Sequence, residues 1–202
     1  WGSQDGIAIA GVVAKSINGF SGLTNTADVI VNDSSEKGGT ALYLGGILGW
    51  TYAAETAEIS ISSCDNSGTV NFNMSGVLRK FGNIFVGGVL GYNPQQVSLQ
   101  LTECTNSGKI TCGKLNSRPS NGDPNCGCKY LGGIVGYLYG NTVVSRCVNS
   151  GIVLNDDDNN STGNSTAPMT GGIVGRARGS SSTARVTLKN NSSIAKDGVY
   201  LQ

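Results

Sequence analysis

A short string built around two adjacent glycines returns along the chain at nearly regular intervals. It reads LGGILG at 44–49, VGGVLG at 86–91, LGGIVG at 131–136 and TGGIVG at 170–175, and a degenerate copy, IAGVVA, stands at 9–14. Self-similarity with a period of about 20 to 50 residues is the signature of a repeat architecture. This repeat constrains the fold more than any other feature of the sequence.

The repeats share further positions when the second glycine of each string is taken as the anchor. A slot that holds either cysteine or leucine follows at Leu23, Cys64, Cys104, Cys147 and Leu188. Two residues later an asparagine stands in each copy, at Asn25, Asn66, Asn106, Asn149 and Asn190. We therefore expect a single domain over 1–202, with repeats at about 7–40, 41–82, 83–127, 128–166 and 167–202.

Each repeat reads as three short β-strands. One strand contains the paired glycines, the second ends at the cysteine slot, and the third follows the Asn-Ser-Gly turn. β-branched segments separated by Gly, Asn and Ser clusters are typical of strands, and no segment shows the 3.6-residue apolar period of a helix. The sequence predicts an all-β fold, a right-handed parallel β-helix (β-solenoid) of about five three-stranded coils, with the hand taken from the rule for parallel crossovers.

The recurring small and amide residues have structural explanations in such a stack. Glycine fits where the chain bends or where two backbones approach closely, and it adopts positive φ without steric cost. Asparagine tolerates the left-handed region, and stacked side-chain amides can hydrogen-bond from one coil to the next. We therefore expect the equivalent asparagines, from Asn25 to Asn190, to form a structural ladder at one corner of the coil.

The Gly-Gly-Ile-Val-Gly strand followed by Cys-x-Asn-Ser-Gly resembles the repeats of GLUG-motif proteins, over about residues 10–195. That family includes bacterial adhesin-like surface proteins and the β-helical, non-catalytic part of some IgA-specific metallopeptidases. The zinc-binding string His-Glu-x-x-His of those peptidases is missing, because the sequence contains no histidine. The resemblance implies an extracellular or cell-surface module that serves adhesion, spacing or assembly, and it implies no protease activity.

Charge and residue type argue against several functions. Charged residues make up 13% of the chain and the formal net charge is +1, so we expect no surface for nucleic acid. The absence of histidine removes the commonest general base and the commonest metal ligand. The longest uncharged apolar stretch, 41–54, is too short and too rich in glycine to span a bilayer. We expect no cofactor, no metal and no membrane insertion.

Polysaccharide lyases and hydrolases also use parallel β-helices. These enzymes need clustered carboxylates, in some classes with a Lys or Arg base. The acidic residues of this chain fall mostly in non-equivalent loops. Glu103 and Arg146 occupy the same slot of adjacent repeats, for which an ion pair between neighbouring strands is the simpler explanation. We therefore expect the chain not to be an enzyme, and a polysaccharide-degrading enzyme is the third of three functional hypotheses.

One set of aromatic residues recurs directly after the third glycine of the string. Its members are Trp50, Tyr92 and Tyr137, with Arg176 at the same place in the fifth repeat. In a stack of coils they would form a stripe suited to the flat faces of sugars, with a guanidinium on the end ring. A second aromatic set recurs three residues before the anchor, at Tyr43, Phe85 and Tyr130. The alternative is that one set fills the core and the other packs under a loop.

Both faces of the Gly-Gly strand are apolar. A strand with one face in water alternates apolar and polar residues, whereas Tyr43, Leu44, Ile47 and Leu48 are all apolar. The outer face must therefore be covered by inserted loops, by a neighbouring domain or by another copy of the protein. An apolar sheet face left uncovered would mark an association surface.

The cysteines and one acidic loop allow further hypotheses. The cysteines of the shared slot, and Cys112, are expected in the core as small apolar side chains. Cys126 and Cys128 lie in the longest insert and are candidates for a disulfide, with each other or with a neighbouring thiol. The run 154–164 resembles a calcium loop but lacks its bidentate glutamate, so a solvated acidic loop is favoured.

The sequence favours a non-enzymatic extracellular structural or adhesive module. Such a module would associate with itself or with neighbouring domains of a larger surface protein, through the Gly-Gly strand face or the open ends of the stack. The alternative is a carbohydrate-binding module that uses the aromatic stripe and has glycans as partners. Candidate acceptors for N-glycosylation, each in an Asn-x-Ser/Thr string, are Asn32, Asn73, Asn160, Asn164 and Asn191.

Overall fold

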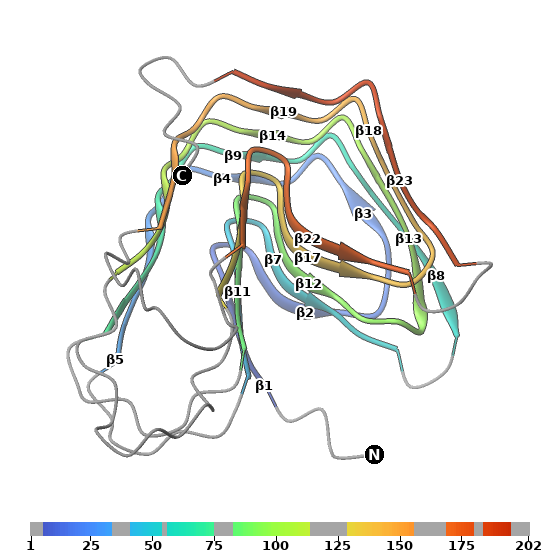
Figure 1. Cartoon of the computed structure of the whole chain (residues 1–202), viewed down its shortest axis with the longest axis horizontal. Coiled ribbons are helices and arrows are strands. Elements are labelled where there is room, and N and C mark those ends of the chain that lie inside the picture. Colours follow the sequence, from blue (N-terminus) through green and yellow to red (C-terminus); the bar gives the residue numbers. More distant parts are fainter. Residues whose placement is uncertain are drawn as a thin grey trace, which may run out of the picture.

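Parallel β-strands build the described structure. The computed structural model describes residues 6–33, 41–53, 56–74, 83–113, 129–155, 169–179 and 184–194, and within these ranges it contains strands and no helix. Strands that occupy the same place in successive repeats pair in parallel and form five sheets. Figure 1 looks along this stack, so that strands of successive repeats lie over one another.

Each of the first four sheets takes one strand from every repeat. The first sheet contains β1 (Gly6–Ala10), β6 (Ala41–Gly45), β11 (Ile84–Gly87), β16 (Lys129–Gly132) and β21 (Met169–Gly171). The second contains β2 (Val13–Ser16), β7 (Leu48–Thr51), β12 (Leu90–Asn93), β17 (Val135–Tyr139) and β22 (Val174–Arg178). The third contains β3 (Phe20–Ser21), β8 (Ala57–Ser62), β13 (Val97–Thr102), β18 (Thr142–Ser145) and β23 (Val186–Lys189).

The two remaining sheets complete the coil. The fourth contains β4 (Thr24–Asn25), β9 (Asp65–Asn66), β14 (Thr105–Asn106), β19 (Val148–Asn149) and β24 (Ser192–Ser193). The fifth has four described strands, β5 (Val29–Asp33), β10 (Val70–Met74), β15 (Ile110–Cys112) and β20 (Val153–Asn155). The all-β prediction is confirmed, and this stacking of parallel strands is consistent with a β-solenoid.

The repeats contain more strands than the sequence predicted. The Gly-Gly strand is divided in two, because β16 ends at Gly132 and β17 begins at Val135 after a bend. A strand of two residues, such as β19, follows the cysteine slot. Periodicity is read over four or more residues, so it misses corners and strands as short as these.

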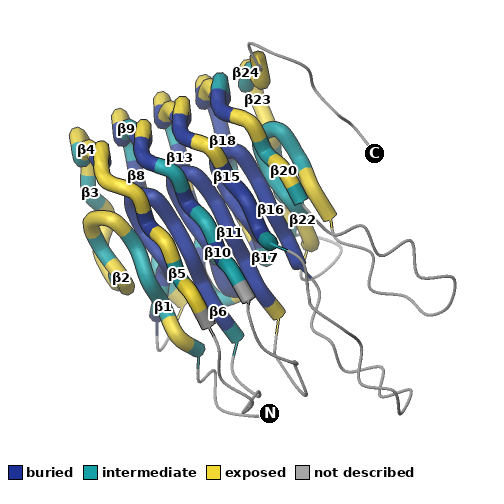
Figure 2. Tube along the Cα trace, turned by 90° about the vertical axis from the view of Figure 1, so that its left-hand side faces the viewer, coloured by how far each residue is buried: buried dark blue, intermediate teal, exposed yellow. Residues whose placement is uncertain are grey.

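Three apolar clusters fill the spaces beside the sheets. The largest joins the second and third sheets and includes Leu48 and Ile59. Another joins the first and fifth sheets and includes Leu44 and Phe72. The third is aromatic and lies in the angle between the first and second sheets. In Figure 2 the buried positions run through the inner repeats, and many exposed positions lie on the two outer repeats.

The paired glycines are required by close approach between repeats. A Cβ placed on Gly88 would lie 2.2 Å from the carbonyl oxygen of Gly133 and 2.4 Å from Cγ of Asn106. The second glycine of the neighbouring repeats is enclosed in the same way. Among the described glycines, positive φ occurs at Gly22 and Gly140, away from the bend. Of the two expected reasons for glycine, close approach is the one that applies at the bend.

A residue with left-handed backbone precedes the cysteine slot in every repeat. The register aligns five such positions, with φ of 69° at Gly22, 51° at Ser63, 55° at Glu103, 54° at Arg146 and 52° at Asn190. For side chains other than glycine and asparagine this region costs about 1–2 kcal/mol. Because the strain recurs in three repeats, at Ser63, Glu103 and Arg146, we infer that pairing of the flanking strands imposes the corner.

The predicted asparagine ladder is confirmed for the first four repeats. Nδ2 of Asn25 donates to Oδ1 of Asn66 at 2.7 Å, and Asn66 donates to Asn106 at 2.7 Å. Asn106 in turn donates to Asn149 at 2.8 Å. All four side chains are buried. Buried amides with satisfied hydrogen bonds specify one register of the repeats, because any shift would leave them without partners.

The fifth position of the ladder is Ser193, which corrects the predicted Asn190. The strand register pairs Asn149 with Ser193. The cysteine slot of this repeat accordingly holds Asn191 instead of Leu188. The sequence alignment of the fifth repeat is wrong by three residues, because a leucine and an asparagine happen to stand at the expected spacing while the pairing of β23 fixes another register.

Candidate functional site

The aromatic stripe predicted from the sequence is in register. Trp50 pairs with Tyr92, Tyr92 with Tyr137 and Tyr137 with Arg176, across β7, β12, β17 and β22. Lys15 of β2 pairs with Trp50 at the opposite end of the column. Three aromatic side chains thus stand between two cations. The predicted stacking is confirmed, while ligand binding by these residues stays a prediction.

A second aromatic column, in the first sheet, faces the stripe. Stacked ring centroids lie 5.4 Å apart for Tyr43 and Phe85 and 5.3 Å apart for Phe85 and Tyr130. Across the angle between the sheets, Tyr43 lies 5.0 Å from Trp50, and Phe85 lies 4.9 Å from Tyr92. Aromatic rings attract one another at these separations in tilted or offset geometry. We call this set the aromatic cluster, which comprises Tyr43, Trp50, Phe85, Tyr92, Tyr130 and Tyr137, with Tyr52 and Tyr139 at its edge.

The aromatic cluster covers the outer apolar face of the Gly-Gly strands. Because each repeat bends at its glycines, the outer faces of the first and second sheets turn toward each other (Figure 1). The exposed fraction is 6% for Tyr43, 4% for Trp50 and 3% for Tyr130. The sequence suggested that inserted loops, a neighbouring domain or another copy of the protein covers this face. In the structure, the side chains that bury it come from adjacent strands of the same repeats.

Cations lie at both ends of the aromatic cluster. Nζ of Lys15 is 3.5 Å from the ring centroid of Tyr52 and 4.6 Å from that of Trp50. At the other end the guanidinium of Arg176 is 5.3 Å from the ring centroid of Tyr130 and donates a 2.7 Å hydrogen bond to its hydroxyl. Sequence reasoning missed Lys15, although it stands four residues after the anchor glycine of the first repeat, in the slot of Trp50.

Burial changes the chemistry of the polar atoms in the cluster. The indole nitrogen of Trp50 is buried and has no acceptor among the described residues. Burial raises the pKa of Tyr43, and it raises the pKa of Tyr92 further with the help of neighbouring tyrosines. Tyrosines held neutral in this way can donate hydrogen bonds but supply no nucleophile near pH 7. The described contacts of the cluster are packing contacts between rings, with cations against its two ends.

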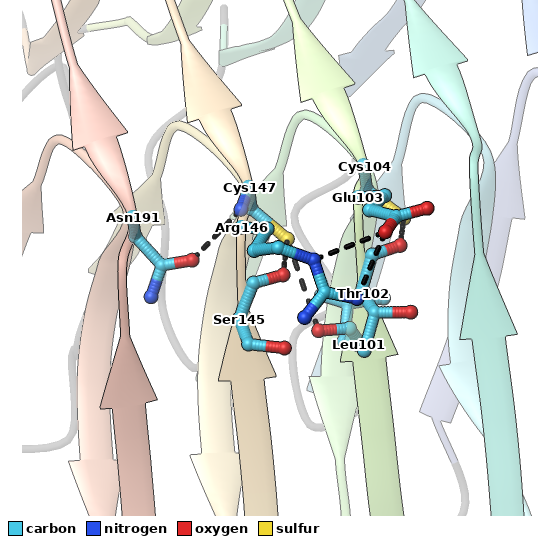
Figure 3. A network of polar contacts seen from close by, with 8 residues as sticks. All are labelled: Leu101, Thr102, Glu103, Cys104, Ser145, Arg146, Cys147 and Asn191. Carbon is cyan, nitrogen blue, oxygen red and sulfur yellow. Dashed lines mark hydrogen bonds and ion pairs between the residues drawn. The ribbon is translucent and has the colours of Figure 1, made fainter.

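The ion pair predicted between neighbouring strands is confirmed. Nη2 of Arg146 lies 2.8 Å from Oε1 of Glu103, and both side chains are more than half exposed (Figure 3). An exposed pair of this kind contributes about 0–1 kcal/mol. In the part of the chain that the structure describes, no group of three or more His, Cys, Asp and Glu side chains could hold a metal ion.

Three cysteines form a third column, which we call the cysteine column. Cys64, Cys104 and Cys147 are free thiols with exposed fractions of 1%, 0% and 0%. Interaction with the Cys147 and Cys64 thiols, together with burial, raises the pKa of Cys104. The same interaction with Cys104 lowers the pKa of Cys64 and of Cys147. The predicted core placement of these cysteines is confirmed, and Cys112 is likewise buried, in the cluster between the first and fifth sheets.

Three of the predicted glycosylation residues lie in the described ranges, namely Asn32, Asn73 and Asn191. In β5 and β10, Nδ2 of Asn73 donates a 3.1 Å hydrogen bond to Asn32. Nδ2 of Asn191, the atom that would be glycosylated, donates to the carbonyl oxygen of Val144 at 2.9 Å. Modification of these asparagines stays a prediction. The remaining predicted residues lie outside the described ranges: Cys126, Cys128, Asn160 and Asn164.

Comparison with known proteins finds no relative of this chain. No family model, no curated protein and no solved structure matches the chain. The class of protein is therefore defined by the fold, as an all-β protein whose parallel sheets are consistent with a β-solenoid. None of the described segments forms a helix with the length and apolar character needed to cross a bilayer. The resemblance to GLUG-motif repeats stays a prediction.

Proposed function

We propose that this chain is a non-enzymatic structural or adhesive module of an extracellular or cell-surface protein. In this proposal it is a right-handed parallel β-helix of about five coils. It acts by stacking against further repeats, which belong to neighbouring domains of a larger surface protein or to another copy. The parallel sheets and the sequence resemblance to GLUG-motif repeats support the proposal.

The observation that supports it most directly is the exposure of apolar columns at the outer repeats. Leu101 and Val144 pair in one column and both have exposed fractions of 0%. Leu188 continues that column in β23 and is 51% exposed. At the opposite end Ile7 is 51% exposed, although its neighbour Leu42 is 4% exposed. A further coil on either side would bury these side chains, with a gain of about 25 cal/mol per Å² of apolar surface.

The Gly-Gly strand face is the weaker of the two association surfaces that the sequence suggested. Most of its apolar side chains, such as Tyr43, Phe85 and Tyr130, are buried within the aromatic cluster. A partner docking there would gain little further burial. The proposal therefore assigns association to the ends of the stack.

Light scattering and electron microscopy of the purified chain test this proposal. We expect oligomers or filaments whose population rises with concentration. Leu188→Lys should weaken them and leave the fold intact, because the side chain is already half exposed. The matched control is Val148→Lys, since Val148 is 37% exposed on the outer face of the fourth sheet. A monomer at every concentration, both for this chain and for any longer chain that contains it, would contradict the proposal.

A second candidate function is carbohydrate binding at the aromatic cluster. Two observations favour it: the indole nitrogen of Trp50 has no acceptor among the described residues, and Lys15 brings a cation beside it. Because most ring faces are buried, a sugar would contact the half-buried rings of the cluster, which are Tyr52, Tyr92 and Tyr139. A glycan that binds should change tryptophan emission, and Lys15→Ala should weaken that response. An unchanged emission across a broad glycan panel argues against this candidate.

Catalysis on polysaccharides is the third hypothesis. The exposed carboxylate of Glu103 is paired with Arg146, and the cysteine column is buried, which supports a non-enzymatic role. Incubation with a panel of polysaccharides should therefore release neither reducing ends nor unsaturated products. Either product, formed by the purified chain and lost on heating, would overturn the non-enzymatic part of the proposal.

A further inference from the structure

The cysteine column places three thiols at the same corner of three successive repeats, each directly before the two-residue strand of the fourth sheet. The backbone nitrogen of Thr105 donates to the carbonyl oxygen of Cys64 at 2.8 Å, and that of Val148 donates to Cys104 at 3.0 Å. Paired strands lie about 4.8 Å apart. This spacing falls within the separation of about 4.4–6.8 Å between Cα atoms that a disulfide spans. Each cysteine is therefore close enough to its neighbour in the column for a covalent bond.

The sulfur atoms point to the same side of the stack. Sγ of Cys104 contacts the carbonyl oxygen two residues earlier at 3.4 Å, and Sγ of Cys147 makes the equivalent contact at 3.5 Å. Sγ of Cys147 also lies 3.8 Å from the carbonyl oxygen of Leu101, which belongs to the repeat of Cys104 (Figure 3). The Cys147 side chain thus leans toward the repeat that contains Cys104.

We propose that Cys104 forms a disulfide with one neighbour, Cys147 or Cys64, when the chain folds in an oxidising medium. In exchange with oxidised glutathione, one S–S bond forms in the protein and the S–S bond of glutathione breaks. The two glutathione thiols that result take up the two protons and two electrons of the cysteines. In-register side chains point alongside one another, so they must tilt to meet, and we expect a strained bond that is easily reduced.

Cys104 is the necessary partner in this chemistry. Cys64 and Cys147 are separated by two strand spacings, about 9.6 Å, which exceeds the limit of about 7 Å for a disulfide without backbone movement. Three thiols form only one bond, so one cysteine of the column stays reduced. The chemistry follows from the column itself and is independent of the proposed function, although an extracellular location would supply oxidising conditions.

Refolding the reduced, denatured chain in a glutathione redox buffer tests the proposal, because every thiol is accessible before the fold closes. Circular dichroism reports recovery of the β-structure, and mass spectrometry of an unreduced digest reports the linkages. We expect the Cys104 peptide to be linked to that of Cys147 or Cys64, two hydrogens lighter than the reduced pair. Cys147→Ser should leave the link to Cys64, and Cys64→Ser should leave the link to Cys147.

Two further variants test whether Cys104 is required for the disulfide. Cys104→Ser should leave Cys64 and Cys147 both reduced, and Cys104→Ala repeats this test without a buried hydroxyl. Cys112→Ser is the matched control, because Cys112 belongs to a different cluster and its loss should leave the linkage unchanged. A refolded wild-type chain in which Cys104 stays reduced, or is linked only to a cysteine outside the column, overturns the proposal without reference to any variant.

Discussion

Asn66 donates its side-chain amide to Oδ1 of Asn106, one repeat further along the stack, and to the carbonyl oxygen of Gly68 in its own turn. The distances are 2.7 Å and 2.8 Å. One buried side chain therefore closes the corner of its own repeat and fixes the position of the next. Because the arrangement recurs at Asn25 and Asn106, the ladder couples four repeats to one register.

Asn106→Ala should lower the free energy of unfolding by about 2–4 kcal/mol, measured by chemical denaturation. The substitution leaves Asn66 without its acceptor and Gly108 without a side-chain donor, and each unsatisfied buried group costs about 1–3 kcal/mol. Asn73→Ala is the control, because its hydrogen bond to Asn32 lies on the surface and its loss should cost less than about 0.5 kcal/mol. Equal losses for the two variants would contradict the structural role of the ladder.

Gly88→Ala should destabilise the protein severely or prevent folding. Its Cβ would lie 2.2 Å from the carbonyl oxygen of Gly133, and neither backbone can move without breaking the ladder beside it. Gly113→Ala provides the comparison, since the nearest atom to its Cβ is the side-chain oxygen of Asn73 at 3.3 Å, which can shift. Thermal unfolding of both variants checks the prediction, and a Gly88→Ala variant as stable as Gly113→Ala would disprove close approach as the reason for the paired glycines.

Glu103→Gly should be more stable than Glu103→Ala, by about 1 kcal/mol. Both variants lose the ion pair with Arg146, but only glycine relieves the left-handed backbone, whose φ is 55°. At Gln100, an exposed position within β13, the order should reverse, because glycine weakens a strand by about 0.5–1 kcal/mol relative to alanine. Urea denaturation of the four variants provides the measurement. The same order at both positions would show that the corner is not strained.

Stability should fall as the pH rises above about 10, the ordinary pKa of tyrosine. The pKa of Tyr92 is raised in the folded state by burial, so the folded chain holds its proton while the unfolded chain releases it. Tyr92 therefore makes its full contribution to stability below the pKa that it has in the unfolded chain. That contribution is lost as the pH rises above this value. Tyr92→Phe should show a smaller drop in unfolding free energy between pH 9 and pH 11 than the unchanged chain. An identical drop would mean that Tyr92 does not contribute to the pH dependence.

Sequence periodicity predicted the parts of the structure that repeat. The ladder from Asn25 to Asn149, the buried Cys104 and the ion pair between Glu103 and Arg146 all follow from placing equivalent residues one above another. The same method failed in the fifth repeat, where Asn190 matches the motif by position but β23 pairs in another register. The backbone hydrogen bonds along the four residues of β23 stabilise this register more than one matching asparagine would stabilise the other. A comparison of sequences does not take that free energy into account.

Outside the second half of the fifth repeat, the sequence by itself determined which residues stack, because parallel strands that recur once per turn align equivalent positions. It therefore contained the column from Trp50 to Arg176 and the apolar character of both faces of the Gly-Gly strand. Only the tertiary structure decided what covers the outer face. The bend at the paired glycines turns Tyr43 against Trp50, and this angle depends on backbone contacts between repeats, such as that of Gly46 with Gly88. Those contacts join residues far apart in the chain, so no local pattern in the sequence reveals them.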